Sequence, residues 1–209
     1  MKFIAIEGNI GSGKSSLALQ LKDHFSGELI PEEFEKNPFL ELFYKNPSKF
    51  AFALENSFFL DRVRQLLGFD FKSDKIIFSD YIINKCLWFA EMNLSIAEYG
   101  QFKLNFEALQ ELFVNPDYLF VLHLPVLKLK ENILKRGRVI ENNIDVDYLE
   151  KLNSIYLEKP LNSVPKKTLV INFRLSDNTS AVYNKLFAKC CEIISASHLN
   201  TQPSNTFYI

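Results

Sequence analysis

Residues 8–16 read GNIGSGKSS and match the pattern G-x-x-x-x-G-K-[ST]. They follow a short apolar segment at 2–7 (KFIAIE) and precede residues 15–25, where apolar residues recur with the spacing of a helix. The pattern therefore lies at a strand-to-helix turn, which is the structural setting that a phosphate-binding loop requires. The sequence predicts a fold that binds a nucleoside triphosphate at this turn.

Each residue type in this loop is expected to have a defined role in binding the triphosphate. The glycines allow the backbone to curl, so that successive N–H groups point at phosphate oxygens beside the positive end of a helix dipole. Lys14 is expected to bring a positive charge to the β- and γ-phosphates, and Ser15 a hydroxyl ligand for Mg²⁺. The residues predicted to bind the triphosphate are Gly8, Asn9, Ile10, Gly11, Ser12, Gly13, Lys14, Ser15 and Ser16.

Five short apolar segments are predicted to form strands: 2–7, 28–31, 75–79, 117–124 and 168–172. None alternates cleanly between apolar and polar residues, which is typical of strands buried on both faces of a parallel sheet. Stretches with helical periodicity separate the strands, so the chain is expected to form an α/β, doubly wound sheet. We expect one domain over residues 1–194, and we interpret the polar stretch 195–209 as a loosely ordered tail.

The composition excludes several classes of protein. The 209 residues are 47% hydrophobic and 23% charged, with a net charge of −1, so neither a disordered chain nor a binder of polymeric nucleic acid is indicated. The three cysteines, Cys86, Cys190 and Cys191, lack metal-ligand spacing and are interpreted as reduced thiols. No run approaches the roughly 20 apolar residues of a membrane span. We expect a cytoplasmic protein with no membrane partner.

Three uses of the phosphate-binding loop remain: a switch GTPase, a motor ATPase or a small-molecule kinase. The predicted third strand is followed by Asp80 and Tyr81 without the glycine of a D-x-x-G motif, and N-K-x-D is absent, which argues against a GTPase. A motor needs more chain than is present. A kinase needs an acceptor carboxylate, for which Glu32 and Glu33 are candidates, and an arginine-bearing lid, for which 135–138 (KRGR) is the candidate. Taken alone, both features could also be surface charge.

Several segments together resemble the deoxynucleoside kinase family. They are EGNIGSGKSS (7–16), EEFEKNPFLELFYKNPSKFAFALE (32–55), SDY (79–81) and NILKRGRVIE (132–141). The resemblance implies a P-loop fold with a five-stranded parallel sheet of order 2-3-1-4-5 and a homodimer. It also implies transfer of the γ-phosphoryl group of ATP to the 5′-hydroxyl of a deoxynucleoside.

The resemblance also implies residue roles. Glu32 corresponds to the general base, with Glu33 as the fallback, and Arg136 and Arg138 to the lid arginines that join Lys14 as catalytic residues. Asp80 corresponds to a carboxylate that supports Mg²⁺ and the substrate site, beside Ser15. The other substrate-binding positions are Tyr44 and Glu141 at the 3′-hydroxyl and Glu55 and Arg62 at the base edge. Phe52, Phe58 and Phe89 are candidates either for pocket walls that stack on the base or for plain core residues.

The sequence departs from the family pattern at three positions. Tyr81 stands where the family has the arginine of an Asp/Glu-Arg-Ser motif, Glu55 replaces a glutamine that reads the base, and Cys86 replaces an aspartate partner of Arg62. An ionised glutamate only accepts hydrogen bonds, so Glu55 would prefer a base edge that presents donors. We interpret these changes as a rebuilt base specificity.

Two other functions use the same phosphate-binding loop. A nucleoside monophosphate kinase would want an arginine cluster for the phosphate of its acceptor, but the chain has only five arginines, two of them in the lid candidate. A nucleotide-binding protein without turnover is supported only by Tyr81. Nucleotide binding without phosphoryl transfer would distinguish it from a kinase.

Overall fold

The computed structural model describes residues 2–34, 37–72, 74–138, 141, 144–196 and 204–209. The strands are β1 (Phe3–Gly8), β2 (Glu28–Ile30), β3 (Ile77–Ser79), β4 (Tyr118–His123), β5 (Leu169–Arg174) and β6 (Ser204–Tyr208). The helices are α1 (Lys14–His24), α2 (Leu40–Lys45), α3 (Pro47–Leu67), α4 (Lys85–Asn93), α5 (Ile96–Leu109), η1 (Gln110–Leu112), α6 (Val126–Arg136), α7 (Val146–Ser163) and α8 (Ser180–Ser195).

All strand pairs that the structure describes are parallel, in the order β2-β3-β1-β4-β5-β6. The first five strands have the predicted order, so the α/β fold with a parallel sheet is confirmed, and a sixth strand extends it beyond β5. β1 lies in the middle, paired with β3 on one side and β4 on the other. Because parallel strands end at the same edge, the turns that follow β1, β2 and β3 meet there, as is typical of ligand sites in open α/β sheets.

The expectation of a loosely ordered tail at 195–209 does not hold for residues 204–209. β6 pairs with β5 from Val170↔Ser204 to Arg174↔Tyr208, and the Phe207 ring stacks on Phe173 with centroids 5.7 Å apart. The sequence did not predict this strand, because the segment owes its order to backbone pairing with β5 and has no strong apolar pattern of its own. Residues 197–203 of the expected tail lie outside the described residues.

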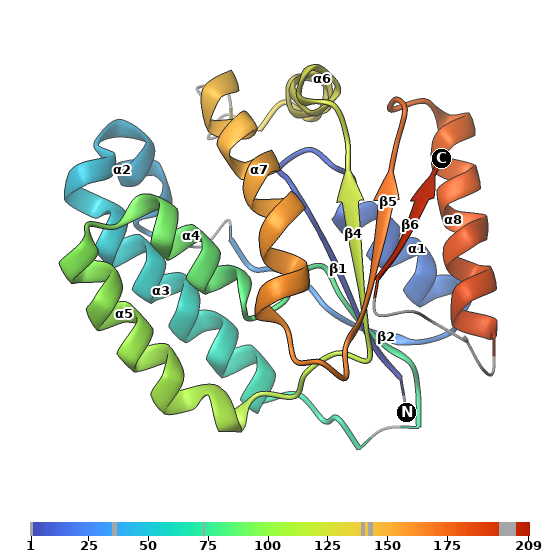
Figure 1. The fold of residues 1–209 in the computed structure, drawn as a ribbon, viewed down its shortest axis with the longest axis horizontal. Helices are drawn as coiled ribbons and strands as arrows, with labels where there is room; N and C mark the ends of the chain where they lie inside the picture. Colours follow the sequence, from blue (N-terminus) through green and yellow to red (C-terminus); the bar gives the residue numbers. More distant parts are fainter. Residues whose placement is uncertain (1, 35–36, 73, 139–140, 142–143, 197–203) are drawn as a thin grey trace.

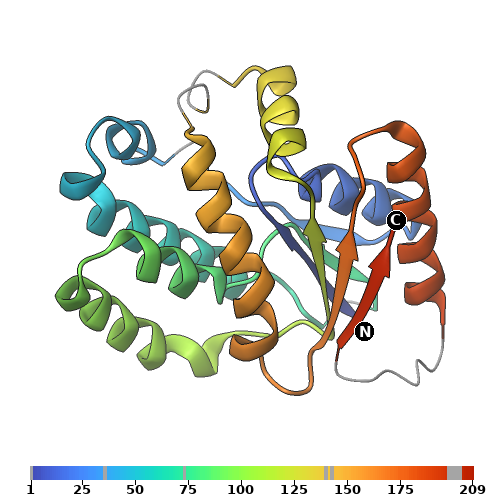
Figure 2. The same ribbon diagram turned by 45° about the horizontal axis from the view of Figure 1, so that its top comes forward.

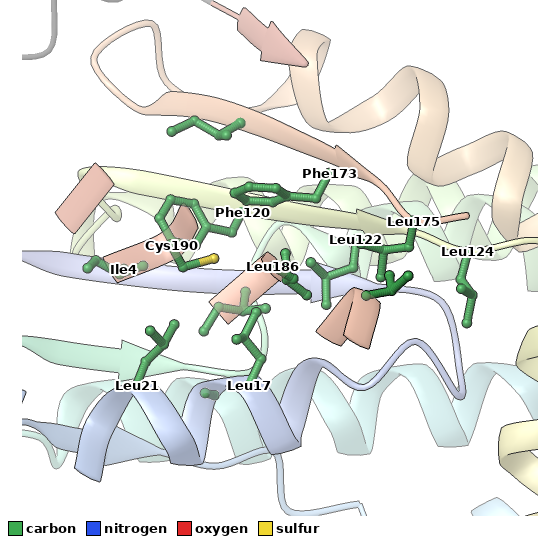
Figure 3. Close-up of a cluster of buried hydrophobic side chains, with 14 of the residues drawn as sticks. Ile4, Leu17, Leu21, Phe120, Leu122, Leu124, Phe173, Leu175, Leu186 and Cys190 are labelled. Atoms are coloured by element: carbon green, nitrogen blue, oxygen red, sulfur yellow. The ribbon is translucent and has the colours of Figure 1, made fainter. Parts of the chain in front are cut away.

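Helices cover both faces of the sheet (Figures 1 and 2). α1 and α8 lie on one face, and α3, α4, α5 and α7 lie on the other. On the first face, Leu17 and Leu21 of α1 and Leu186 of α8 pack against Ile4 and Phe120 of the central strands, as Figure 3 shows. Residues of the strands alternate between the two faces, so each strand contributes to both halves of the core.

The second face carries charged residues among its apolar ones. α3 begins at Pro47 and is capped by Asn46, whose side chain accepts a hydrogen bond from the Lys49 N–H at 3.3 Å. The buried stripe of this helix contains Glu55 and Arg62 in addition to aliphatic and aromatic side chains. Fully buried charges need partners, so this stripe marks where the helix faces a polar site. None of the described helices combines the length and apolar content needed to cross a bilayer.

Candidate active site

The phosphate-binding loop between β1 and α1 is shaped by glycines in the left-handed backbone region. Gly11 has φ +82° and Gly13 has φ +86°. A Cβ atom on Gly11 would lie 2.7 Å from the carbonyl oxygen of Leu129, and one on Gly13 would lie 2.9 Å from the Tyr183 ring. Only glycine fits these positions without displacing a neighbour. α1 begins at Lys14 with no acidic side chain in its first turn, so its positive end suits an anion.

Three helices hold this loop from outside. The Asn132 side chain of α6 donates to the Gly11 carbonyl at 2.8 Å, and the Tyr183 hydroxyl of α8 donates to the Gly13 carbonyl at 2.6 Å. The Asn9 side chain donates to a backbone carbonyl of α7 at 2.8 Å. These bonds fix the curl of the loop before any ligand binds.

Ser15 and Asp80, the predicted metal ligands, lie in direct contact. The Ser15 hydroxyl donates a short hydrogen bond to Asp80 Oδ2, and Asp80 Oδ1 accepts from the Glu32 backbone N–H at 2.6 Å. The described part of the chain holds no group of three or more His, Cys, Asp or Glu that could bind a metal on its own. A hydroxyl and one carboxylate suit Mg²⁺, which keeps several waters and takes its other ligands from phosphates.

Glu32 lies at the centre of a buried ion-pair cluster. Arg62 Nη2 donates a short hydrogen bond to Glu32 Oε1, and Lys85 Nζ lies 3.0 and 3.2 Å from the two carboxylate oxygens. Burial alone would raise the pKa of Glu32, but Lys85 and Arg62 hold it well below its usual range. Glu32 is therefore ionised at neutral pH. The fallback candidate, Glu33, is exposed and lies 3.6 Å from the Arg64 guanidinium at the surface.

A second carboxylate, Glu7, supports this cluster from the sheet. Its Oε1 accepts from the Ile82 N–H at 2.9 Å, its Oε2 accepts from the Tyr156 hydroxyl at 2.9 Å, and Lys85 Nζ lies 3.7 Å away. Burial raises the pKa of Glu7 against the lowering effect of Lys85 and Lys14. Burial likewise lowers the pKa of Lys14, with Lys85 acting in the same direction.

Tyr81 does not supply the positive charge that the arginine of the family motif would bring to the site. It is 1% exposed, and its hydroxyl donates to Gln65 Oε1 at 2.9 Å. Its ring lies 5.7 Å from the Arg62 guanidinium, on the side of the apolar core. Tyr81 therefore packs beneath the site and brings no charge into it.

Glu55 lines the same cavity as the phosphate-binding loop. It is 3% exposed and accepts a hydrogen bond from Asn93 Nδ2 at 2.7 Å. Burial raises the pKa of Glu55 to about 7, although Asn93 and Arg62 lower it. Nearby, the Cys86 thiol accepts from Arg62 Nη1 at 3.1 Å, so the position of the expected aspartate still contacts Arg62.

The lid arginines contact Glu141. Arg136 Nε and Nη2 both donate to Glu141 Oε2, at 3.1 and 2.5 Å, and Arg138 Nη1 lies 3.5 Å from Oε1. Gly137 between them has φ +68° and ends α6. Burial raises the pKa of Tyr44, and Glu141 acts in the same direction. Residues 139–140 of the matching segment 132–141 lie outside the described residues.

One cavity collects most of the predicted site. It encloses about 890 Å³, including the space at its mouth. The predicted residues that line it are Gly8, Ile10, Lys14, Ser15, Glu32, Tyr44, Glu55, Phe58, Arg62, Phe89, Arg136, Arg138 and Glu141. Asp80 reaches it through Ser15 and Glu32. Phe52 does not line the cavity. The other predicted residues of the phosphate-binding loop do not line it either; they are Asn9, Gly11, Ser12, Gly13 and Ser16.

Sequence reasoning missed several lining residues, above all Lys85. Asn93, Tyr148 and Tyr156 also line the cavity, and Phe34 and Leu40 add apolar walls. Lys85 did leave a signal, because it is the only charged residue in the apolar run YIINKCLWFA (81–90). A lone charge in such a run is buried only if it is paired.

Comparisons of the sequence with known proteins point to one family. The model of the family described as deoxynucleoside kinase matches residues 4–195. A deoxyguanosine kinase of Bacillus subtilis is 36% identical over 157 residues, 74% of this chain and 76% of that protein. A deoxyguanosine kinase of Lactobacillus johnsonii is 29% identical over 215 residues, 92% of this chain and 94% of that protein.

A solved structure shares the fold. It is the deoxyadenosine kinase of M. mycoides with bound dATP, which covers 92% of this chain and 100% of its own. The TM-score is 0.76 and the sequence identity 24%. At this identity the match supports the arrangement of helices and strands rather than the choice of base.

Proposed function

The chain belongs to the deoxynucleoside kinase family and is an ATP-dependent deoxynucleoside kinase, and we propose that its preferred acceptor is 2′-deoxyguanosine. The observation that carries the catalytic part is that Lys14 of the phosphate-binding loop and the ionised Glu32 line one cavity. A donor phosphate bound at Lys14 and a hydroxyl bound at Glu32 would meet inside it. Such positioning supplies most of the catalysis of phosphoryl transfer.

At the donor end, the triphosphate of ATP binds the backbone N–H groups of residues 8–16 and the Lys14 ammonium. Ser15 and Asp80 would hold Mg²⁺, which neutralises charge on the phosphates when it is bound. Arg136 and Arg138 exchange Glu141 for oxygens of the transferring group, because planar guanidinium groups bind phosphate as they bind carboxylate. Closure of this lid excludes water that would otherwise hydrolyse ATP.

At the acceptor end, Glu32 orients the 5′-hydroxyl and accepts its proton. The 5′-oxygen forms a bond to the γ-phosphorus while the bond to the β–γ bridging oxygen breaks, and ADP leaves with that electron pair. Tyr44 and Glu141 hold the 3′-hydroxyl. Phe58 and Phe89 line the walls between which the base lies.

Glu55 supports the choice of guanine. An ionised carboxylate only accepts hydrogen bonds, and guanine presents N1–H and N2–H donors side by side on its pairing edge. Adenine and cytosine present one donor and one acceptor there, which suits an amide better than a carboxylate. The Bacillus subtilis relative is also a deoxyguanosine kinase.

The test is a phosphorylation assay of the purified protein with Mg-ATP and each deoxynucleoside and ribonucleoside in turn, with Glu32→Gln as the control. We expect the 5′-monophosphate to form fastest from deoxyguanosine and to be lost in the control. Faster turnover of another deoxynucleoside would overturn the base assignment alone. Absence of product from every nucleoside, with deoxynucleoside monophosphates turned over instead, would overturn the choice of acceptor.

We also propose that the protein works as a cytoplasmic homodimer, as its family resemblance implies, with β6 included in the single kinase domain expected over residues 1–194. Sedimentation velocity at micromolar concentration tests the oligomeric state. A mass of twice 24.2 kDa is expected, and a single species of 24.2 kDa would contradict it.

A further inference from the structure

Lys85 is a buried cation to which no role has been given. It is the first residue of α4, and its side chain is 5% exposed. Its ammonium lines the active-site cavity and lies 5.5 Å from the Phe89 ring. Burying an ammonium is costly unless it is paired and hydrogen-bonded, so its surroundings must repay that cost.

Two carboxylates provide the compensation, and they are not equivalent. Glu7 comes from the middle of the sheet and lies 3.7 Å from Lys85 Nζ. Glu32 follows the edge strand β2 and contacts Nζ through both of its oxygens, at 3.0 and 3.2 Å. Burial alone would lower the pKa of Lys85, but Glu32 and Glu7 raise it, so the side chain stays charged. Lys85 thus connects a fixed carboxylate to the one proposed to act on the acceptor.

Arg62 alone cannot fix the orientation of the Glu32 carboxylate. It donates to Glu32 Oε1 with one terminal nitrogen while the other donates to Cys86. A contact at one oxygen leaves the carboxylate able to turn about that bond. Lys85, on the opposite oxygen as well, fixes the plane of the group.

We propose that Lys85 is a positioning residue for phosphoryl transfer: held by Glu7, its ammonium contacts both oxygens of Glu32 and keeps this carboxylate turned toward the acceptor hydroxyl. Together with Arg62 it supplies positive charge beside this carboxylate, which Tyr81, packed below against Gln65, does not. This inference rests on the role proposed for Glu32 in the kinase reaction.

The first test is Lys85→Met, with Lys159→Met as the matched control. Lys159 also pairs with a glutamate, at 2.6 Å from Glu91, but it is not among the residues that line the cavity. For Lys85→Met we expect kcat to fall about 100-fold, because a carboxylate misplaced by an ångström costs that much, with the KM for Mg-ATP unchanged. Lys159→Met should keep wild-type kcat, and Lys85→Arg, which retains the charge, should recover part of the loss.

The split between kcat and KM gives a readout that a merely structural role would not move. A loss confined to kcat, partly recovered in Lys85→Arg, indicates that the ammonium positions Glu32 rather than supporting the fold or the ATP site. A kcat equal to that of the wild type would overturn the proposal. If Glu32→Gln were fully active instead, the proposed role of Glu32 would fail first, and the two failures are distinguishable.

A second variant separates positioning from charge balance and covers misfolding of the single one. In Glu7→Gln/Lys85→Met neither side chain of the Glu7–Lys85 pair is left as an uncompensated charge. If Lys85 positions Glu32, this variant keeps the low kcat relative to Glu7→Gln alone. If Lys85 only neutralises Glu7, the two variants have equal kcat, and the proposal is wrong.

Discussion

The two ends of the active-site cavity are built in different ways. The donor end is one continuous segment, residues 8–16, whose backbone curls around the place of the phosphates. The acceptor end is a set of side chains from separate elements: Glu32 after β2, Glu55 and Arg62 on α3, and Lys85 on α4. Nine neighbouring residues are enough to bind the phosphates through their backbone N–H groups. Binding of the acceptor by side chains depends instead on how elements distant in sequence pack together.

The difference extends to tolerance of change. At the donor end, the constraint is conformational, since Gly11 and Gly13 occupy the left-handed region and lie against neighbouring atoms. At the acceptor end, the constraint is electrostatic, since charges compensate one another at short range. A substitution at the donor end should therefore alter shape, and one at the acceptor end should alter pKa values and base choice.

The largest effect on kcat should come from a pair of variants, one at each end of the cavity. Glu32→Gln should lower kcat by about 10²–10⁴-fold, as loss of a general base does, while Mg-ATP still binds. Lys14→Met should lower kcat by about 10²–10³-fold and also weaken ATP, because its charge acts on the donor phosphates. Steady-state kinetics and calorimetric titration of ATP measure both. Equal loss of ATP binding in the two variants would contradict the separation.

A smaller effect is expected from Glu55→Gln, which leaves the donor end intact. The amide cannot accept from both guanine donors, so kcat/KM for deoxyguanosine should fall about 10–100-fold, as expected for loss of a bidentate contact to a base. Turnover of deoxyadenosine or deoxycytidine should rise. Competition assays with mixed nucleosides measure the ratio directly, and an unchanged ratio would show that Glu55 does not read the base.

The pH dependence of acceptor binding should be smaller again. Burial raises the pKa of Glu55 to about 7, so below that pH the group holds a proton that it must release to accept from guanine. The affinity for deoxyguanosine should rise about tenfold between pH 6 and 8, in proportion to the ionised fraction. Fluorescence or calorimetric titration across this range measures it. Glu55→Gln should give a flat profile, and a wild-type affinity that falls with pH would refute the assignment.

The smallest effect concerns the donor loop itself. Gly13→Ala places a Cβ in the left-handed region and against Tyr183, which should destabilise the fold by about 1–2 kcal/mol and weaken ATP. Gly100→Ala, in α5 with nothing within 4 Å of an added Cβ, is the matched control and should stabilise the helix by about 0.5–1 kcal/mol. Urea denaturation with and without ATP measures both changes. Equal stabilities of the two variants would show that the left-handed turn is not constrained.

The contrast also explains what the sequence could reveal. Continuous apolar runs predicted five parallel strands, the resemblance implied their order, and a contiguous motif predicted the donor loop. Strand β6 was missed because Ser204–Tyr208 has no strong apolar pattern and owes its order to pairing with β5. Lys85 was missed because its partners, Glu7 and Glu32, are 78 and 53 residues distant in sequence and meet it only in the folded sheet.

Asp80 joins the two ends through a single carboxylate. One oxygen accepts from the Ser15 hydroxyl and the other from the backbone N–H of Glu32. A donor that draws Ser15 away from Asp80 therefore changes the hydrogen bonding of the residue that receives the acceptor. Thermodynamic linkage makes this influence reciprocal: whatever free energy the donor contributes to acceptor binding, the acceptor returns to donor binding. The affinity of each substrate is thus a property of the pair, and neither half of the cavity has an affinity of its own.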